Sequence, residues 1–267
     1  MRSLAFINEK GGTAKTTLAV NVAAYLATVK RLSVLLVDLD TQGHAGKSLG
    51  LDVRRIPCNV FHWLTDSSVT LGHVKQKTSM DRLQVVPAYR EMAEFPVQVS
   101  ADPRRTWRLA DKLKLEAGGY DVVVMDGPPS LGLTTLNILV AATEVVIPVA
   151  LTYLALDGCA EVAQTVERVA REQHRPDLHV SRVVPTLYRK TALAEEIHQS
   201  LERYFPGKVT EPLGINVKID EAQSHGKTIF EYAPKSRGAQ MLGAIAEEIY
   251  AVGSVAAHEL LSQATVG

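Results

Sequence analysis

The sequence predicts a single α/β domain, residues 1–267, built on one doubly wound, mostly parallel sheet flanked by helices. Short apolar runs alternate with longer segments of helical periodicity along the whole chain. The runs 33–38 and 122–126 are apolar on both faces, as strands covered by helices on two sides tend to be. No Ser/Gly-rich linker or block of charge divides the 267 residues, so one domain is expected.

The expected elements follow one another in a regular order. Strands are expected at 4–8, 33–38, 83–87, 122–126, 144–149 and 180–187, with a short edge strand at 208–211. Helices are expected at 14–30, 60–64, 103–116 (capped by Asp102), 134–142, 155–173, 193–205 and 236–261, the last broken near Gly253.

Composition limits the classes of protein that this chain can be. Lys plus Arg and Asp plus Glu number 29 each, so a nucleic-acid partner would have to meet a local basic patch. Cys58 and Cys159 are far apart and form no CxxC pair, which argues against a disulfide framework or a cysteine metal site. The N-terminal run 1–8 is too short for a signal peptide, and no apolar stretch reaches about 18 residues. A cytoplasmic protein is therefore expected.

A glycine-rich loop joins the first expected strand to the first expected helix. Such loops cradle phosphates because their backbone N–H groups and the helix dipole converge on the anion. Lys15 is expected to reach the β- and γ-phosphates of ATP, Thr16 to ligate Mg²⁺, and Thr17 to contact the α-phosphate. Glu9 and Ala14 replace the two glycines of the GxxxxGK[ST] pattern, and the methyl group of Ala14 requires φ below zero. The expected nucleotide-binding residues are Lys10, Gly11, Gly12, Thr13, Ala14, Lys15, Thr16 and Thr17.

Aspartates close two of the other expected strands. The second strand ends in the segment Asp38–Gly43, and Asp126 closes the run 122–126. Because ligands of open α/β sheets bind beyond the carboxyl ends of the strands, these side chains should meet the glycine-rich loop. Asp126 is expected to hold Mg²⁺, Asp38 to support the magnesium shell, and Asp40 to position the attacking water.

Four separated segments carry a resemblance to a known family. Residues 8–17 resemble the deviant Walker A box of the ParA/MinD class of P-loop ATPases, 37–44 resemble its second box, and 120–130 resemble its Walker B region. Residues 216–239 are especially similar to the ParA/Soj chromosome-partition branch. The match covers nearly the whole chain. It departs from the family at Ala14, where glycine is usual, at Thr41, where proline is common, and at Gly46, where a small hydroxyl residue is frequent.

The resemblance implies an ATP-dependent partition cycle. Family members form ATP sandwich homodimers in which the lysine matching Lys10 reaches the partner's phosphates, so the expected catalytic residues are Lys10, Lys15 and Asp40. The ATP-bound dimer binds double-stranded DNA without sequence preference. A ParB-like partner stimulates the weak ATPase and releases the dimer. Repeated cycles on the nucleoid then segregate a chromosome or a plasmid.

DNA binding through the phosphate backbone requires clustered basic residues. Lys190 and Lys218 resemble positions that contact DNA in the Soj-like branch. The expected DNA-binding set is Arg189, Lys190, Lys218, Lys227, Lys235 and Arg237.

Four other interpretations are weighed against DNA partition. A MinD-like membrane ATPase would need a basic amphipathic tail, but His258–Gly267 contains no Lys or Arg, so no membrane partner is expected. A relative of the nitrogenase iron protein would need cysteines placed to hold a bridging cluster, and Cys58 and Cys159 do not fit. A ParA-like positioner of a protein cargo stays open. A nucleotide-dependent scaffold without turnover is disfavoured by the intact Lys15, Asp40 and Asp126.

Overall fold

The computed structural model describes residues 1–152 and 155–264, with side chains described up to residue 252. Its centre is an eight-stranded sheet in the order β3-β4-β2-β5-β1-β6-β7-β8. Within the described residues β3 and β4 pair antiparallel, and the other neighbouring strands pair parallel. The predicted fold class is therefore confirmed. The strands are β1 (Arg2–Phe6), β2 (Val34–Asp38), β3 (Gln76–Lys77), β4 (Leu83–Val86), β5 (Val122–Asp126), β6 (Glu144–Ala150), β7 (His179–Tyr188) and β8 (Leu213–Gly214).

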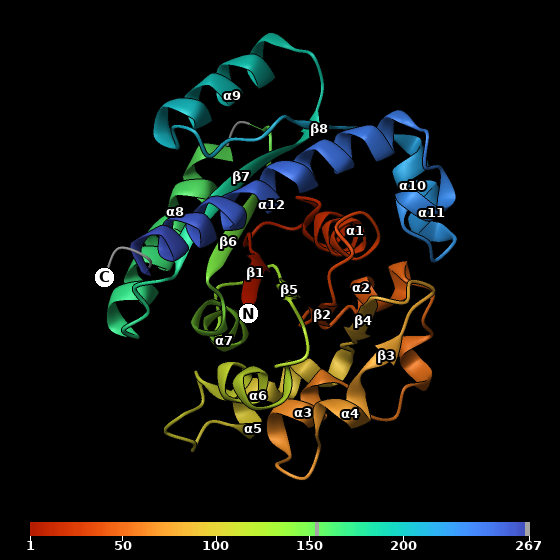
Figure 1. Ribbon diagram of the computed structural model, residues 1–267, viewed down its shortest axis with the longest axis vertical. Helices are drawn as coiled ribbons and strands as arrows, with labels where there is room; N and C mark the ends of the chain where they lie inside the picture. The colour runs from red at the N-terminus through yellow and green to blue at the C-terminus, as the bar shows by residue number, and fades with distance from the viewer. Residues whose placement is uncertain (153–154, 265–267) are drawn as a thin grey trace.

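Helices cover both faces of this sheet (Figure 1). The α-helices are α1 (Lys15–Thr28), α2 (His44–Ser48), α3 (Val60–Thr65), α4 (Leu71–Val74), α5 (Phe95–Gln98), α6 (Arg108–Glu116), α7 (Leu133–Ala141), α8 (Ala155–Glu172), α9 (Ala192–Tyr204), α10 (Val217–Ser224), α11 (Ile229–Tyr232) and α12 (Arg237–Ala264). Two short 3-10 helices, Val53–Arg55 and Arg90–Glu94, complete the described elements.

The central strands are apolar at consecutive positions because alternate side chains pack into two different cores, one on each face of the sheet. In β5, Val122 and Val124 pack with α1 and α12, whereas Val123 and Met125 face the core that contains Trp63 of α3. All of these side chains are almost completely shielded from solvent. Burial of each such side chain contributes about 1.5–3 kcal/mol, so the two cores hold the helices firmly on the sheet.

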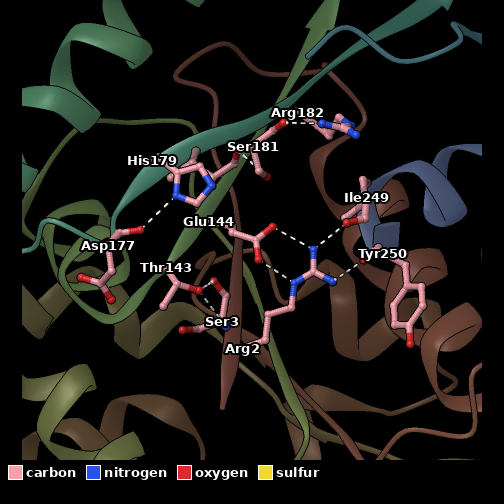
Figure 2. Close-up of polar contacts among 11 residues, drawn as sticks. Arg2, Ser3, Thr143, Glu144, Asp177, His179, Ser181, Arg182, Ile249 and Tyr250 are labelled. Atoms are coloured by element: carbon pink, nitrogen blue, oxygen red, sulfur yellow. Dashed lines mark hydrogen bonds and ion pairs between the residues drawn. The ribbon is translucent and has the colours of Figure 1, made fainter. Parts of the chain in front are cut away.

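The amino edge of the sheet is closed by a buried ion pair (Figure 2). Arg2, the first residue of β1, donates from Nε and Nη2 to the two carboxylate oxygens of Glu144, at 2.6 and 2.8 Å. Its guanidinium also donates to the carbonyl oxygens of Ile249 and Tyr250, at 2.5 and 3.0 Å. One side chain thus fastens β1, β6 and α12 together.

Three of the predicted elements were wrong by more than two residues. The helix expected at 103–116 begins at Arg108, because Asp102 accepts from the Arg104 N–H and from Arg108 Nε and so holds a turn before it. The edge strand lies at Leu213–Gly214, and within 208–211 only the isolated bridge at Val209 pairs with β7. Helix α12 continues through Gly253, since one glycine costs a helix only about 1 kcal/mol.

The C-terminal tail bears on the membrane alternative. Its last residues, 265–267, lie outside the described part of the chain, as do the side chains from 253 onward. Among the residues described, no helix combines the length and the apolar character that a membrane crossing requires.

Candidate nucleotide-binding site

Three polar segments meet at the carboxyl edge of the central strands. In the parallel register Phe6 of β1 and Asp38 of β2 both lie level with Asp126 of β5. The glycine-rich loop follows β1, so it emerges beside both aspartates. The structure therefore brings together the three strand ends that the sequence places at one site, as the geometry of open α/β sheets requires.

The glycine-rich loop is anchored at both ends by side chains. Asn8, which is buried, donates to the carbonyl oxygen of Pro148 at 2.6 Å, and its Oδ1 accepts from the Lys10 N–H at 2.9 Å. Further along, the Thr186 hydroxyl of β7 donates to the carbonyl oxygen of Thr13 at 3.2 Å. These contacts fix the loop against β6 and β7.

The prediction for Ala14 was wrong. Its φ is +63° and its ψ is 27°, in the left-handed region, where the sequence interpretation required φ below zero. The loop passes through the same region at Gly12, with φ +72°. Left-handed backbone turns the loop back toward the start of α1, and the conformation costs an alanine about 1–2 kcal/mol. The loop thus keeps its shape despite the strain at Ala14.

Lys15 lies under the loop at the start of α1. The residue is only 7% exposed, and its Nζ donates to the carbonyl oxygen of Lys10 at 3.0 Å. Burial lowers the pKa of the Lys15 ammonium, while the nearby Asp126 and Asp40 oppose that shift. A cation held at this position beneath converging N–H groups is suited to an anionic phosphate chain.

Asp126 and Thr16 are in direct contact at the carboxyl end of β5. The Thr16 hydroxyl donates to Asp126 Oδ2 at 2.6 Å, whereas Asp126 Oδ1 is buried without a hydrogen-bond partner among the described residues. Burial raises the pKa of the Asp126 carboxyl to about 7, with Thr16 opposing the shift. No cluster of three or more metal-ligating side chains occurs in the described residues. One carboxylate and one hydroxyl fit Mg²⁺ well, because this ion takes much of its coordination from water and substrate phosphates.

Asp38 and Asp40 are held by the loop that joins β2 to α2. Asp38 is fully buried; its Oδ1 accepts from the Asp40 N–H at 3.0 Å, and its Oδ2 accepts from the Ala45 N–H at 3.0 Å. Burial raises the pKa of the Asp38 carboxyl, and the neighbouring Asp126 raises it further. Asp40 Oδ1 accepts from the Gln42 N–H at 3.0 Å. Asp38 therefore shapes the loop that carries Asp40, and its place in the magnesium shell stays a prediction.

Lys10 lies against its own chain. The Lys10 Cε and Nζ atoms stand 3.1 and 3.3 Å from where a side chain on Gly158 would begin, so Lys10 packs along the first turns of α8. Next to it, burial raises the pKa of the Glu9 carboxyl, and a hydrogen bond with Glu161 of the same helix adds to the shift. A reach into a second protomer would require Lys10 to leave α8.

The six predicted DNA-binding residues are all exposed. They fall into two groups, one in the loop after β7 and one in the segment from α10 to the start of α12. Lys218 Nζ contacts Glu221 Oε2 at 2.7 Å, so part of its charge is already neutralised. The first group is Arg189 and Lys190; the second is Lys218, Lys227, Lys235 and Arg237.

Three polar residues of the site escaped the sequence interpretation. Asn8 and Thr186 anchor the phosphate loop, and Gln223 of α10 donates from Nε2 to the Thr17 hydroxyl at 2.7 Å. A polar residue that ends an apolar strand, as Asn8 does, was the available signal for the first. Thr186 and Gln223 lie far from the loop in sequence, and only the fold brings them to it.

Comparison with known proteins agrees with this geometry. A family model described as an AAA domain matches residues 1–180. The sporulation initiation inhibitor protein Soj of Bacillus subtilis is 36% identical over 252 residues, covering 94% of this chain and 98% of that protein. The chromosome-partitioning ATPase Soj of Thermus thermophilus is 39% identical over 254 residues, covering 94% and 96%. A crystal structure named as cobyrinic acid a,c-diamide synthase from Mycobacterium smegmatis, with bound ATP analogue and magnesium, superposes with a TM-score of 0.79 at 30% identity, covering 92% and 93%.

Proposed function

Because the chain belongs to the Soj/ParA family of chromosome-partitioning ATPases, we propose that it hydrolyses ATP in a cycle of binding to and release from non-specific DNA. The observation that carries the proposal is the meeting of the phosphate loop, Asp40 and Asp126 at one sheet edge. ATP and Mg²⁺ are the cofactors of this site. The cycle would move a chromosome or plasmid over the nucleoid of the cell.

The residues of the site divide the chemistry among them. The loop N–H groups and Lys15 bind and orient the phosphate chain, and Thr16 with Asp126 would hold Mg²⁺. Magnesium, when bound, neutralises charge on the β- and γ-phosphates. Asp40, which accepts from the Gln42 N–H and is 8% exposed, would orient a water at the γ-phosphate. Slow hydrolysis follows if this water is fully aligned only when a ParB-like partner docks.

A second copy of the chain completes the proposed site. Lys10 would move from α8 to the phosphates of the facing protomer, where it offsets the repulsion between two buried nucleotides. Dimerisation would also double the exposed basic surface of the loop after β7 and of the α10–α12 segment. Because backbone contacts to DNA act additively through released counterions, doubling the surface strengthens binding steeply.

The test is DNA binding and phosphate release measured on the same protein. We expect magnesium and ATP to produce a dimer that retains mixed-sequence duplex DNA, with affinity that falls as salt rises. Lys15→Ala should lose nucleotide binding and, with it, both the dimer and DNA retention. Lys218→Glu is the matched surface variant, which should weaken DNA binding while leaving the ATP dimer intact.

Each alternative activity corresponds to a distinct result. DNA affinity that does not depend on ATP would contradict the proposed cycle, and absence of phosphate release under every condition would leave only a scaffold. Recruitment to anionic lipid vesicles without DNA binding would favour a membrane-associated positioning ATPase. ATP-dependent DNA retention with a protein complex as the cargo would keep the chemistry and change the cargo alone.

A further inference from the structure

The helix that carries Lys218 is hydrogen-bonded to the first turn of α1, directly after the phosphate loop. Gln223, five residues further along α10, donates from Nε2 to the Thr17 hydroxyl at 2.7 Å. Thr17 is the last residue of the predicted nucleotide-binding segment. Since α10 rises about 1.5 Å per residue, the five residues from Lys218 to Gln223 span less than 10 Å along the helix axis.

Two more contacts hold the α10–α11 segment to nucleotide-facing elements. Asn21, on the same face of α1 as Thr17, donates to the Thr17 carbonyl oxygen at 2.8 Å and accepts from the Ile229 N–H of α11 at 3.0 Å. The turn between α10 and α11 also packs on the end of α2, so closely that a side chain on Gly226 would begin 2.6 Å from the Gly50 Cα. Figure 1 shows α10 and α11 together beside the start of α12.

The same elements surround a shared polar cleft. A hollow of about 390 Å³ is lined by Thr16 and Thr17 of α1, His44 and Lys47 of α2, and Gln223 of α10. Helix α2 begins directly after the loop held by Asp38, and α1 begins directly after the phosphate loop, so the cleft is bounded by the helices that follow both loops and by α10. Gln223 is the α10 side chain in this cleft that hydrogen-bonds to α1.

We propose that Gln223 is a positioning residue through which nucleotide bound at the phosphate loop fixes α10 in the orientation that binds DNA. The proposal rests on the proposed function. It adds an intramolecular relay, from Thr17 through Gln223 to Lys218, to the effect of dimerisation.

The chemistry of the Thr17 hydroxyl explains why the relay responds to nucleotide. A hydroxyl donates one hydrogen bond and accepts two, so Thr17 can accept from Gln223 while donating to a phosphate oxygen. Hydrogen bonds in such a chain polarise and strengthen one another. Bound phosphate therefore tightens the contact of Gln223 with Thr17, and α10 becomes more rigidly held on α1.

The experiment measures how strongly nucleotide and DNA binding are coupled. Fluorescence anisotropy with a labelled mixed-sequence duplex gives the DNA affinity with and without a non-hydrolysable ATP analogue and magnesium. Gln223→Met keeps the volume of the side chain and removes the hydrogen bond. The factor by which the analogue raises DNA affinity should therefore be about three to ten times smaller than in wild type. Gln98→Met, the same substitution at an exposed position of α5 outside the cleft, should keep the wild-type ratio.

Measuring the coupling from the DNA side as well distinguishes the relay from a merely structural role of Gln223. By linkage, DNA must raise the affinity for the analogue by the same factor by which the analogue raises the affinity for DNA. Gln223→Met should reduce both factors equally, with an unchanged thermal midpoint and an unchanged fraction of dimer in light scattering.

The outcomes separate this inference from the proposed function. If the analogue raises DNA affinity in wild type and by the same factor in Gln223→Met, the relay is overturned and the proposed function is not. Loss of the ATP dimer in Gln223→Met would overturn it too, since the defect would then precede DNA binding. A wild-type factor of one would overturn the relay and the proposed function together.

Discussion

Buried charged side chains are paired at the amino edge of the central sheet and incompletely paired at its carboxyl edge. At the amino edge Arg2 satisfies both carboxylate oxygens of Glu144 and two helix carbonyl groups (Figure 2). At the carboxyl edge Asp126 Oδ1 is buried with no partner among the described residues, and the pKa values of Asp38 and Asp126 are both raised by burial. The charges at the amino edge are paired with one another, whereas the carboxyl edge keeps a buried carboxylate oxygen that is unpaired among the described residues.

This difference indicates where stability and function lie. A buried charge without a partner costs folding free energy, and proteins accept that cost at functional sites. The substitutions below should therefore have opposite signs at the two edges.

The largest effect is expected at the amino edge. Arg2→Ala leaves Glu144, whose side chain is 7% exposed, as an uncompensated charge, so the free energy of unfolding should fall by about 3–5 kcal/mol. Urea unfolding monitored by circular dichroism measures the change. The double variant Arg2→Met with Glu144→Met is the control and should recover much of the loss, because it removes both charges together. A loss below about 1 kcal/mol in Arg2→Ala would show that the pair is not structural.

At the carboxyl edge the corresponding change should stabilise the protein. The pKa of Asp126 is about 7 in the folded chain against 3.8 as its ordinary value. An acid whose folded pKa is raised contributes stability at pH below its unfolded value, and that contribution is lost as pH rises toward 7. Asp126→Asn should therefore raise the free energy of unfolding by up to roughly 4 kcal/mol above pH 7, and by progressively less as pH falls toward 4.

This prediction is checked by urea unfolding across pH in chelator, without nucleotide. Asp81→Asn, at an exposed position, is the matched control and should change stability by less than about 0.5 kcal/mol. An Asp126→Asn variant that is no more stable than wild type at pH 8 would mean that the buried carboxylate is not strained.

The smallest effect is expected at Ala14. Glycine at φ +63° avoids the left-handed penalty of about 1–2 kcal/mol but costs about 0.5–1 kcal/mol in chain entropy, so Ala14→Gly should stabilise by about 0.5–1 kcal/mol. Ala244→Gly, exposed inside α12, is the same substitution with the opposite expected sign, a loss of about 1 kcal/mol. Thermal unfolding compares the two variants, and a destabilised Ala14→Gly would contradict the strain.

Much of the carboxyl edge could be predicted from sequence because its signals are local. The apolar run that ends in Asp126 and the glycine-rich turn before a helix can each be recognised within one short stretch of sequence. The φ of Ala14 could not be predicted in this way, since the path of the loop outweighs the preference of one residue. Neither could the contact of Gln223 with Thr17, which depends on how α10 packs against α1.

The pairing of Lys218 with Glu221 lies between these cases. Its i, i+3 spacing on a helix is visible in the sequence, but the boundaries of α10 had to be known first. The amino edge was not predicted at all, because Arg2, Glu144 and Tyr250 come from three distant segments.

The central claim is that Asp126 and Thr16 hold the magnesium that accompanies ATP at the phosphate loop. Calorimetric titration of ATP into wild type and Asp126→Asn, each with magnesium and with chelator, tests it most directly. In wild type, magnesium should tighten ATP binding by about tenfold or more, equivalent to roughly 1.4 kcal/mol. Asp126→Asn should keep the magnesium-free affinity, which depends on Lys15 and the loop, and lose the effect of magnesium. An undiminished effect of magnesium in Asp126→Asn would contradict the account.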